Sequence, residues 1–113
     1  MLIDFKTLKE NHLPNFKGGE GELVNYAFQD ELCKIMYGKL EPGSTIGYHT
    51  HETNSEMIFI LSGTADILYE DTTETVTAGQ CHYCPMGRSH SMRNFGEEDL
   101  IFYAVVPEQL SQE

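Results

Sequence analysis

The feature that most restricts the fold of this chain is the grouping of its apolar residues after position 22. They occur in short runs, and turn-forming residues such as Gly, Pro, Asn and Asp separate the runs. No segment in this part keeps a 3.6-residue period for three turns, whereas short runs between turns are typical of strands. The runs predict strands at 22–28, 32–40, 56–61, 64–69, 74–77, 80–84, 90–94 and 100–106. The pattern therefore indicates an all-β sandwich or barrel.

The first 22 residues follow a different pattern. Phe5 and Leu8 have the spacing of one helical turn, but Pro14 and the glycine-rich run 18–21 interrupt any longer period. We therefore predict an irregular N-terminal arm over residues 1–22 and a single domain over residues 23–113. A chain of 113 residues leaves room for one domain and can bury a core without help from disulfide bonds.

The charge of the chain excludes two classes of partner. Eighteen acidic residues against seven basic ones give a net charge of -11, and the five lysines all lie within residues 6–39. Neither nucleic acid nor an anionic membrane surface is expected as a partner, because both require clustered Lys and Arg. The sequence also lacks an apolar stretch of membrane-spanning length and a secretion signal, which predicts a cytoplasmic protein.

Three cysteines, Cys33, Cys81 and Cys84, are an odd number, and in a reducing compartment this predicts free thiols. Cys81 and Cys84 do have the Cys-x-x-Cys spacing of redox and zinc motifs. A helix should follow the pair in a redox motif, and a second pair is missing for a zinc site. Two small side chains on a strand are the simpler interpretation.

Histidines at positions 49 and 51 carry the first chemical signal. Residues two apart in an extended strand point the same way, so His49 and His51 can reach one ion. Five residues later, Glu56 opens the apolar run 56–61, where burying a carboxylate is costly without a partner. A metal ion would supply that partner. Solvated loop residues are an equally good interpretation of these three side chains alone.

A wider set of spacings distinguishes the two interpretations. One set comprises Gly43, His49, His51, Glu56 and Gly63, and after fifteen further residues a second set comprises Gly79, Pro85, Gly87, His90 and Asn94. Both sets resemble the two motifs of the cupin superfamily, and their short separation resembles that of small single-domain microbial cupins. The resemblance implies a double-stranded β-helix, also called a jelly roll or cupin barrel. It implies less about the reaction, because one fold hosts many functions.

The resemblance also implies a metal site. In cupins the residues that match His49, His51, Glu56 and His90 bind one divalent metal ion. Three imidazole nitrogens and one carboxylate oxygen suit Mn(II), Fe(II), Co(II), Ni(II) or Zn(II) better than Ca(II) or Mg(II). Four protein ligands leave two positions open on an octahedral ion, where water, a substrate or dioxygen can bind.

The cavity beside this site is expected to have apolar walls. Alternation along the strands places two isoleucines on the face of Glu56 and a methionine on the face of His90, and resemblance to small cupins adds four further residues. The predicted cavity residues are Met36, Gly38, Ile58, Ile60, Met92, Phe102 and Ala104.

Few side chains in this region can act as a general acid or base, which isomerases and epimerases need besides the metal. The candidates are His82, Tyr37 and Tyr103, with Lys34 and Tyr83 as further possibilities. Alternation alone allows Tyr37 and Tyr103 to face the cavity, and it does not say whether His82 or Tyr83 does. The identity of the catalytic residues therefore stays undecided, and a reaction promoted by the bound metal ion is easier to support than one that needs a general acid or base.

The leading hypothesis is a metal-dependent enzyme that acts on a small organic molecule, with dioxygenase-like chemistry preferred to a related oxidative, lyase or isomerase reaction. The alternative is a metal-dependent domain that binds or senses a small molecule without chemistry. A transcription regulator is not expected, because no helix-turn-helix pattern accompanies the barrel. Small cupins often pair, and the apolar outward positions Met57, Phe59 and Leu61 favour a homodimer.

Overall fold

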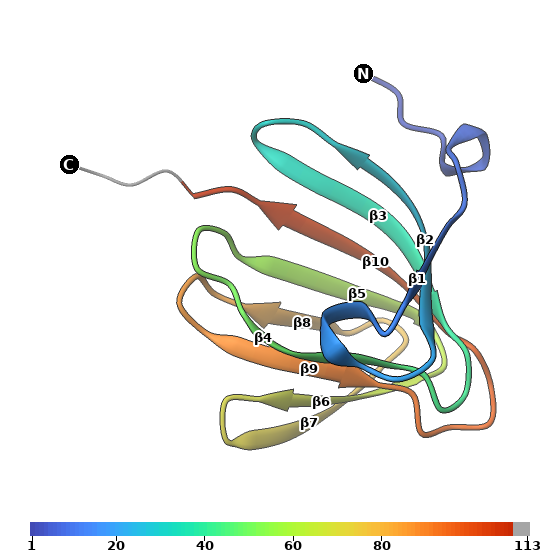
Figure 1. Ribbon diagram of the computed structural model, residues 1–113, viewed down its shortest axis with the longest axis vertical. Coiled ribbons are helices and arrows are strands. Elements are labelled where there is room, and N and C mark those ends of the chain that lie inside the picture. Colours follow the sequence, from blue (N-terminus) through green and yellow to red (C-terminus); the bar gives the residue numbers. More distant parts are fainter. Residues whose placement is uncertain (110–113) are drawn as a thin grey trace.

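A computed structural model describes residues 1–109 as strands and two short 3-10 turns arranged in two layers (Figure 1). The strands are β1 (Asn11–Pro14), β2 (Glu22–Gln29), β3 (Cys33–Leu40), β4 (Thr45–Thr50), β5 (Glu56–Ser62), β6 (Thr64–Tyr69), β7 (Thr72–Thr77), β8 (Cys81–Cys84), β9 (Ser89–Arg93) and β10 (Leu100–Pro107). The turns are η1 (Phe5–Thr7) and η2 (Phe16–Gly18).

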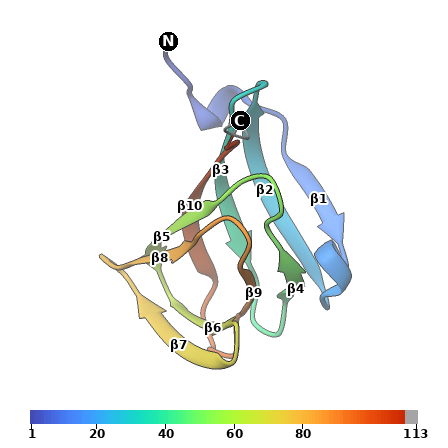
Figure 2. The ribbon, with the colours of Figure 1, turned by 90° about the vertical axis from the view of Figure 1, so that its left-hand side faces the viewer.

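Two antiparallel sheets form the layers. The larger sheet has the strand order β1-β2-β3-β10-β5-β8, and the smaller sheet has the order β4-β9-β6-β7. Figure 1 shows the larger sheet above the smaller one, and Figure 2 shows β1 at its outer edge beside β2. Because β10 lies between β3 and β5, strands that are distant in sequence become neighbours, as in a jelly roll. The expected all-β double-stranded β-helix is confirmed.

The turns between strands use glycine where the backbone requires it. Gly63 joins β5 to β6 with a φ of 85°, and Gly79 precedes β8 with a φ of 88°. A side chain other than glycine is strained in this left-handed region. These turns fall where the sequence analysis placed them, so the strand boundaries around them agree closely with prediction.

The hydrophobic core lies between the two sheets. Its fully buried members include Leu23, Leu40, Ile67, Leu100 and Phe102, which come from both layers. Alternation produces this arrangement, because every second residue of a strand points toward the opposite layer. Burial of each such side chain contributes about 1.5–3 kcal/mol to the free energy of unfolding.

The structure contains two strands that the sequence analysis did not list. β1 lies within the predicted irregular arm and pairs with β2, so residues 11–14 join the larger sheet. β4 carries His49 and was not predicted as a separate strand, because its short polar sequence lacks an apolar run. A shift of register between Ile46 and His49 interrupts its pairing with β9, which further weakens the alternating pattern.

The predicted barrel domain extends to residue 113, and residues 110–113 lie outside the described part of the chain. None of the helical segments among residues 1–109 is long and apolar enough to cross a membrane. The thiols of Cys33, Cys81 and Cys84 are free, in agreement with the odd cysteine count.

Candidate metal centre

Four side chains that are dispersed in sequence meet at one end of the barrel interior. The ligand atoms of His49, His51, Glu56 and His90 all lie within 4.8 Å of one another. The three imidazole rings form a nearly equilateral triangle, with centroid separations of 4.8, 4.9 and 5.0 Å. The structure therefore brings together the same four residues that the cupin resemblance implied.

The strand register places these side chains. His49 on β4 is the direct cross-strand partner of His90 on β9, so both rings leave the same sheet side by side. His51 follows β4, and its backbone N–H donates to the carbonyl of Arg88 over 3.0 Å. Glu56 is the first residue of β5 in the opposite sheet. The carboxylate and the imidazoles thus approach one point from both layers.

Each imidazole is oriented through its Nδ1 atom. The Nδ1–H of His49 donates to the carbonyl oxygen of Gly47 over 2.8 Å, and that of His51 donates to Oδ1 of Asn54 over 2.6 Å. His90 Nδ1 lies 3.0 Å from Nε2 of His82. With Nδ1 carrying the proton, the Nε2 lone pair of each neutral ring is directed at the cluster.

This donor set fits a divalent transition metal. The Nε2 atoms of His51 and His90 lie 2.9 Å apart, and Oε1 of Glu56 lies 3.2 and 3.0 Å from them. Adjacent ligand atoms with bonds of about 2.1 Å at right angles are about 3 Å apart. When both Nε2 atoms are unprotonated, their lone pairs and the carboxylate repel one another unless a cation lies between them. The nitrogen-rich set favours a transition metal over Ca(II) or Mg(II), and its identity stays open.

The ionisation of the cluster also suits cation binding. Burial raises the pKa of the Glu56 carboxyl, but hydrogen bonds from His51 and His90 outweigh burial and lower the pKa to about 2. Burial lowers the pKa of His49, so this ring is neutral at physiological pH. Burial also lowers the pKa of His51, but hydrogen bonds to Glu56 and Asn54 reverse the effect and leave the pKa raised. His51 is therefore the ligand at which a proton competes most directly with a metal.

A cavity of about 390 Å³ opens beside the cluster. Met36 and Phe102, both predicted as cavity residues, line it together with Ile46 and Leu23. The other five predicted cavity residues are buried but do not line it: they are Gly38, Ile58, Ile60, Met92 and Ala104. The reason is that Phe102 lies over Gly38, where a Cβ would overlap the ring, and fills the barrel beyond that point. Most of the residues predicted to line the cavity therefore belong to the packed interior of the barrel instead.

The N-terminal arm closes one side of this cavity, which the sequence analysis did not predict. Phe16 and Lys17 of η2 line the cavity, and η2 lies beside β4 (Figures 1 and 2). The contact is so close that a Cβ on Gly47 would overlap the carbonyl of Lys17. Glycines at 18, 19 and 47 were the available signal, since glycine permits close backbone approach. Asn54, which orients His51, had no comparable signal.

Two lysines face the cavity without an acidic partner. Lys34 lies on the inner face of β3, in the same alternation as Met36, and Lys17 reaches the cavity from η2. Their Nζ atoms lie 6.0 and 5.6 Å from the centroid of the Phe16 ring. Among residues 1–109 neither ammonium forms an ion pair with a carboxylate. Burial lowers the pKa of Lys34.

The cavity wall also carries acidic side chains. Asp30, Glu52 and Glu108 line it. Asp30 is engaged elsewhere, because it accepts hydrogen bonds from the backbone N–H groups of Leu32 and Cys33 at 2.9 Å. The Thr53 hydroxyl donates to Glu108 over 3.3 Å. The lysines that line the cavity are Lys17 and Lys34, and they are the basic side chains that could attract a bound anion.

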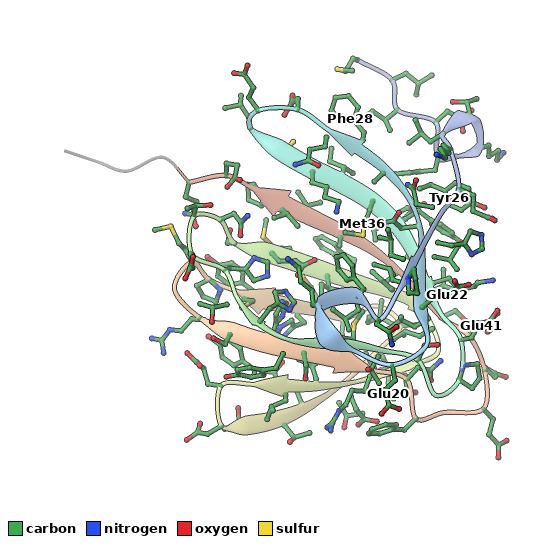
Figure 3. All side chains as sticks on the ribbon, in the orientation of Figure 1. Glu20, Glu22, Tyr26, Phe28, Met36 and Glu41 are labelled. Atoms are coloured by element: carbon green, nitrogen blue, oxygen red, sulfur yellow. The ribbon has the colours of Figure 1, made fainter. Side chains whose placement is uncertain are left out.

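The positions of the acid and base candidates correct one expectation. Tyr37 and Tyr103 lie on the outer face of the larger sheet, where they pack with Phe5, so neither reaches the cluster. The side of β3 that packs against the opposite layer carries Met36, and Tyr37 therefore points outward. Figure 3 shows Met36 toward the interior of the barrel and Tyr26, a ring neighbour of Tyr37, near the N-terminal segment.

Strand β8 presents its histidine to the interior. His82 and Cys84 are buried, whereas Tyr83 is 53% exposed, which answers the question that alternation left open. His82 does not join the four ligands, but its Nε2 contacts Nδ1 of His90. Burial raises the pKa of the Cys84 thiol to about 11, so this sulfur stays protonated at neutral pH and is not poised to bind metal.

Comparison with known proteins agrees with this geometry. A cupin domain model matches residues 36–106. The chain is 30% identical over 112 residues to an oxalate-binding protein of Thermotoga maritima, with 94% of this chain and 93% of that protein covered. Oxalate binding is a property named for that relative.

Solved structures show the same barrel. A crystal structure described as a predicted oxalate decarboxylase from Thermotoga maritima superposes with a TM-score of 0.89 at 28% identity, covering 96% of this chain and 99% of that one. A Cupin 2 conserved barrel domain protein from Salinispora arenicola superposes with a TM-score of 0.70 at 19% identity, covering 96% and 87%, and this likeness concerns the fold alone. With its two motifs, its barrel and the matching family model, the chain belongs to the cupin family.

Proposed function

We propose that the protein binds a small carboxylic acid anion, with oxalate as the first to test, at a divalent transition metal held by His49, His51, Glu56 and His90. The observation that carries this proposal is the cavity of about 390 Å³ that joins the four-residue cluster to two lysines without acidic partners. A bound metal would supply a Lewis acid with open positions for carboxylate oxygens. Support for oxalate comes from the name of the relative in Thermotoga maritima.

The residues of the chain have distinct tasks in this proposal. Neutral His49 and ionised Glu56 provide ligands without first losing a proton. Lys34 lies on the inner face of β3, where its ammonium attracts a carboxylate into the cavity. Phe16 covers one side and reduces the access of water, which strengthens both attractions. Such a site selects a small anion rather than a large apolar molecule.

The test is oxalate binding by the metal-loaded protein, measured by calorimetry with Zn(II) and Mn(II) in turn. We expect saturable binding of oxalate and weaker binding of acetate, which has only one carboxylate. Lys34→Met should weaken oxalate binding roughly 10-fold, the usual loss for one charge-assisted hydrogen bond, and leave metal affinity unchanged. Lys39→Met is the matched control, because Lys39 belongs to the same strand but pairs with Glu41 outside the cavity. Equal oxalate binding by both variants would contradict the role of Lys34.

An enzyme is the second candidate, and Lys34 is the observation that favours it. Its pKa is lowered by burial, so it can donate a proton during a reaction more readily than a solvated lysine. Dioxygenase-like chemistry and decarboxylation both belong to this candidate. Incubation of the metal-loaded protein with oxalate, catechols, enediols and 1,3-diketones, followed by assays for formate, carbon dioxide and oxygen uptake, separates an enzyme from a binding protein. Binding without product or oxygen uptake would favour capture alone.

A homodimer also remains a proposal. Phe59 and Leu61 on the outer face of β5 are 43% and 42% exposed, and Tyr103 on β10 is the cross-strand neighbour of Phe59. An apolar strip of this kind suits a covered sheet face. Light scattering should give twice the mass of one chain, and a monomer at micromolar concentration would contradict the proposal. The expectation of a cytoplasmic location stays a prediction.

A further inference from the structure

Three hydrogen-bonded side chains, His90, His82 and Glu74, lead from the cluster to the surface through the wall of the barrel. His82 is 2% exposed and lies between Glu74 and His90. Its Nδ1 is 2.7 Å from Oε1 of Glu74, and its Nε2 is 3.0 Å from Nδ1 of His90. The side chain of Glu74 is 41% exposed, so this row of side chains ends in solvent. The row leaves the cluster on the side away from the cavity, because neither Glu74 nor His82 lines that cavity.

When His90 binds a metal, only one assignment of donors and acceptors satisfies the hydrogen bonds among these three side chains. The Glu74 carboxylate can only accept, so His82 Nδ1 carries a proton toward it. The Nε2 of a neutral His82 is then an acceptor, and it receives the Nδ1–H of His90. This leaves the Nε2 lone pair of His90 free, 3.0 Å from Oε1 of Glu56, as metal binding requires.

The other two imidazoles are oriented more directly. His49 donates to the carbonyl of Gly47, and His51 donates to Asn54, and both acceptors are neutral groups. From its Nδ1 atom His90 alone reaches an anionic group, and it does so through the His82 ring, whose plane is inclined by 25° to its own. A carboxylate behind an imidazole increases the electron density at the nitrogen that binds metal. His90 should therefore be the strongest donor of the three.

We propose that His82, oriented by Glu74, is a positioning residue that fixes the ring orientation and tautomer of His90 for metal binding. The inference rests on the proposed metal site. His82 comes from the larger sheet, whereas His90 and Glu74 come from the smaller one, so the hydrogen bonds also join the two layers at the cluster. An apolar side chain would fill this space with less desolvation cost, which indicates a role besides packing.

The decisive measurement is the tautomer of each ring in the Zn(II)-loaded protein labelled with ¹⁵N. Long-range proton–nitrogen NMR correlations distinguish a protonated ring nitrogen from an unprotonated one. We expect the proton on Nδ1 of both His82 and His90. A proton on Nε2 of His82 in the metal-bound protein would overturn the proposal, because His82 could not then accept from His90. A merely structural His82 has no such requirement.

Four variants supply an independent measurement of Zn(II) affinity by competition with a chelator. His82→Leu removes the acceptor and should weaken binding about 10–100-fold, the usual loss for an outer partner of a metal ligand. His82→Gln keeps an acceptor oxygen and should recover most of that loss. Glu74→Gln should weaken binding by roughly 10-fold, at the lower end of the same range. Asp71→Asn is the control, because it removes one charge from the exposed turn of the same hairpin.

The outcomes separate this inference from the proposed function. Wild-type protein that binds no metal would remove both. Wild-type protein that binds Zn(II), with Glu74→Gln and His82→Leu binding equally well, would overturn the positioning role alone. If His82→Leu fails to fold, Glu74→Gln still decides, since its side chain is partly exposed and its replacement leaves the core intact.

Discussion

The two ends of the barrel interior use the same strands for opposite purposes. The inner face of β3 carries Lys34 and Met36 beside the cavity and Leu40 at the far end, where Leu40 and its cross-strand neighbour Leu100 are fully buried. At the far end apolar burial stabilises the fold. At the cluster end the same sheet holds buried polar groups that cost free energy without a ligand. We infer that one end determines stability and the other determines binding.

The strongest test of this division removes a ligand. His51→Ala should abolish stoichiometric metal while the β-sheet circular dichroism spectrum is retained, because three remaining donors bind far more weakly and the core is untouched. Elemental analysis of the purified protein after metal loading and dialysis measures the result. Full metal occupancy in this variant would show that His51 is not a ligand.

A core truncation at the other end should have the reverse effect. Leu40→Ala should lower the free energy of unfolding by about 2–5 kcal/mol, since it leaves a cavity in a fully packed region. Urea denaturation of the metal-free protein measures the loss. Metal affinity of the folded fraction should be unchanged. A comparable loss of affinity would mean that the two ends are coupled.

Acid should also affect the two ends differently. The pKa of His51 is raised by its hydrogen bonds to Glu56 and Asn54 in spite of burial, so below that pKa a proton competes with the metal. Each pH unit below it should weaken metal binding roughly tenfold, as expected when one proton is displaced. Titrations between pH 8 and pH 5 in steps of about one unit measure the slope. Constant affinity across this range would contradict the ligand assignment.

The same groups determine how the metal-free protein responds to pH. Glu56 has a pKa lowered from 4.5 to about 2, so its contribution to stability is present above pH 4.5 and is lost as the pH falls toward 2. His51 has a raised pKa, so its contribution is present below its usual value of 6.5 and is lost as the pH rises through the raised value. The combined contribution of Glu56 and His51 should therefore be largest between these limits, whereas the lowered pKa of His49 makes the contribution of that ring fall as the pH drops below 6.5. Thermal melts across this range would show it.

The smallest effect is expected outside the barrel. Tyr103→Phe removes a hydroxyl from the outer face of β10, where the ring is 37% exposed. Stability should change by less than about 0.5 kcal/mol, as for most surface substitutions, and metal and oxalate affinity should not change. A clear loss of oxalate binding would show that the outer face takes part in function.

Particular residues show how far the sequence could predict this structure. The spacing of His49, His51, Glu56 and His90 was sufficient to indicate the cluster, because in cupins the residues at those spacings bind one metal ion. His82 was left undecided, since alternation relates it to Cys84 but not to the interior. Phe16 and Lys17 were assigned to an irregular arm, because their packing against Gly47 depends on a contact between distant segments.

The sequence by itself determined the all-β fold, the positions of the turns and which residues share a face of each strand. Those properties follow from local sterics and the two-residue period of a strand. Alternation left open which face is the inside, and the tertiary structure decided it; for Met36 the decision agrees with what the cupin resemblance implied. Met36 rather than Tyr37 faces the cavity, and His82 rather than Tyr83 faces His90, because packing of one sheet against the other selects between two faces that local geometry treats alike.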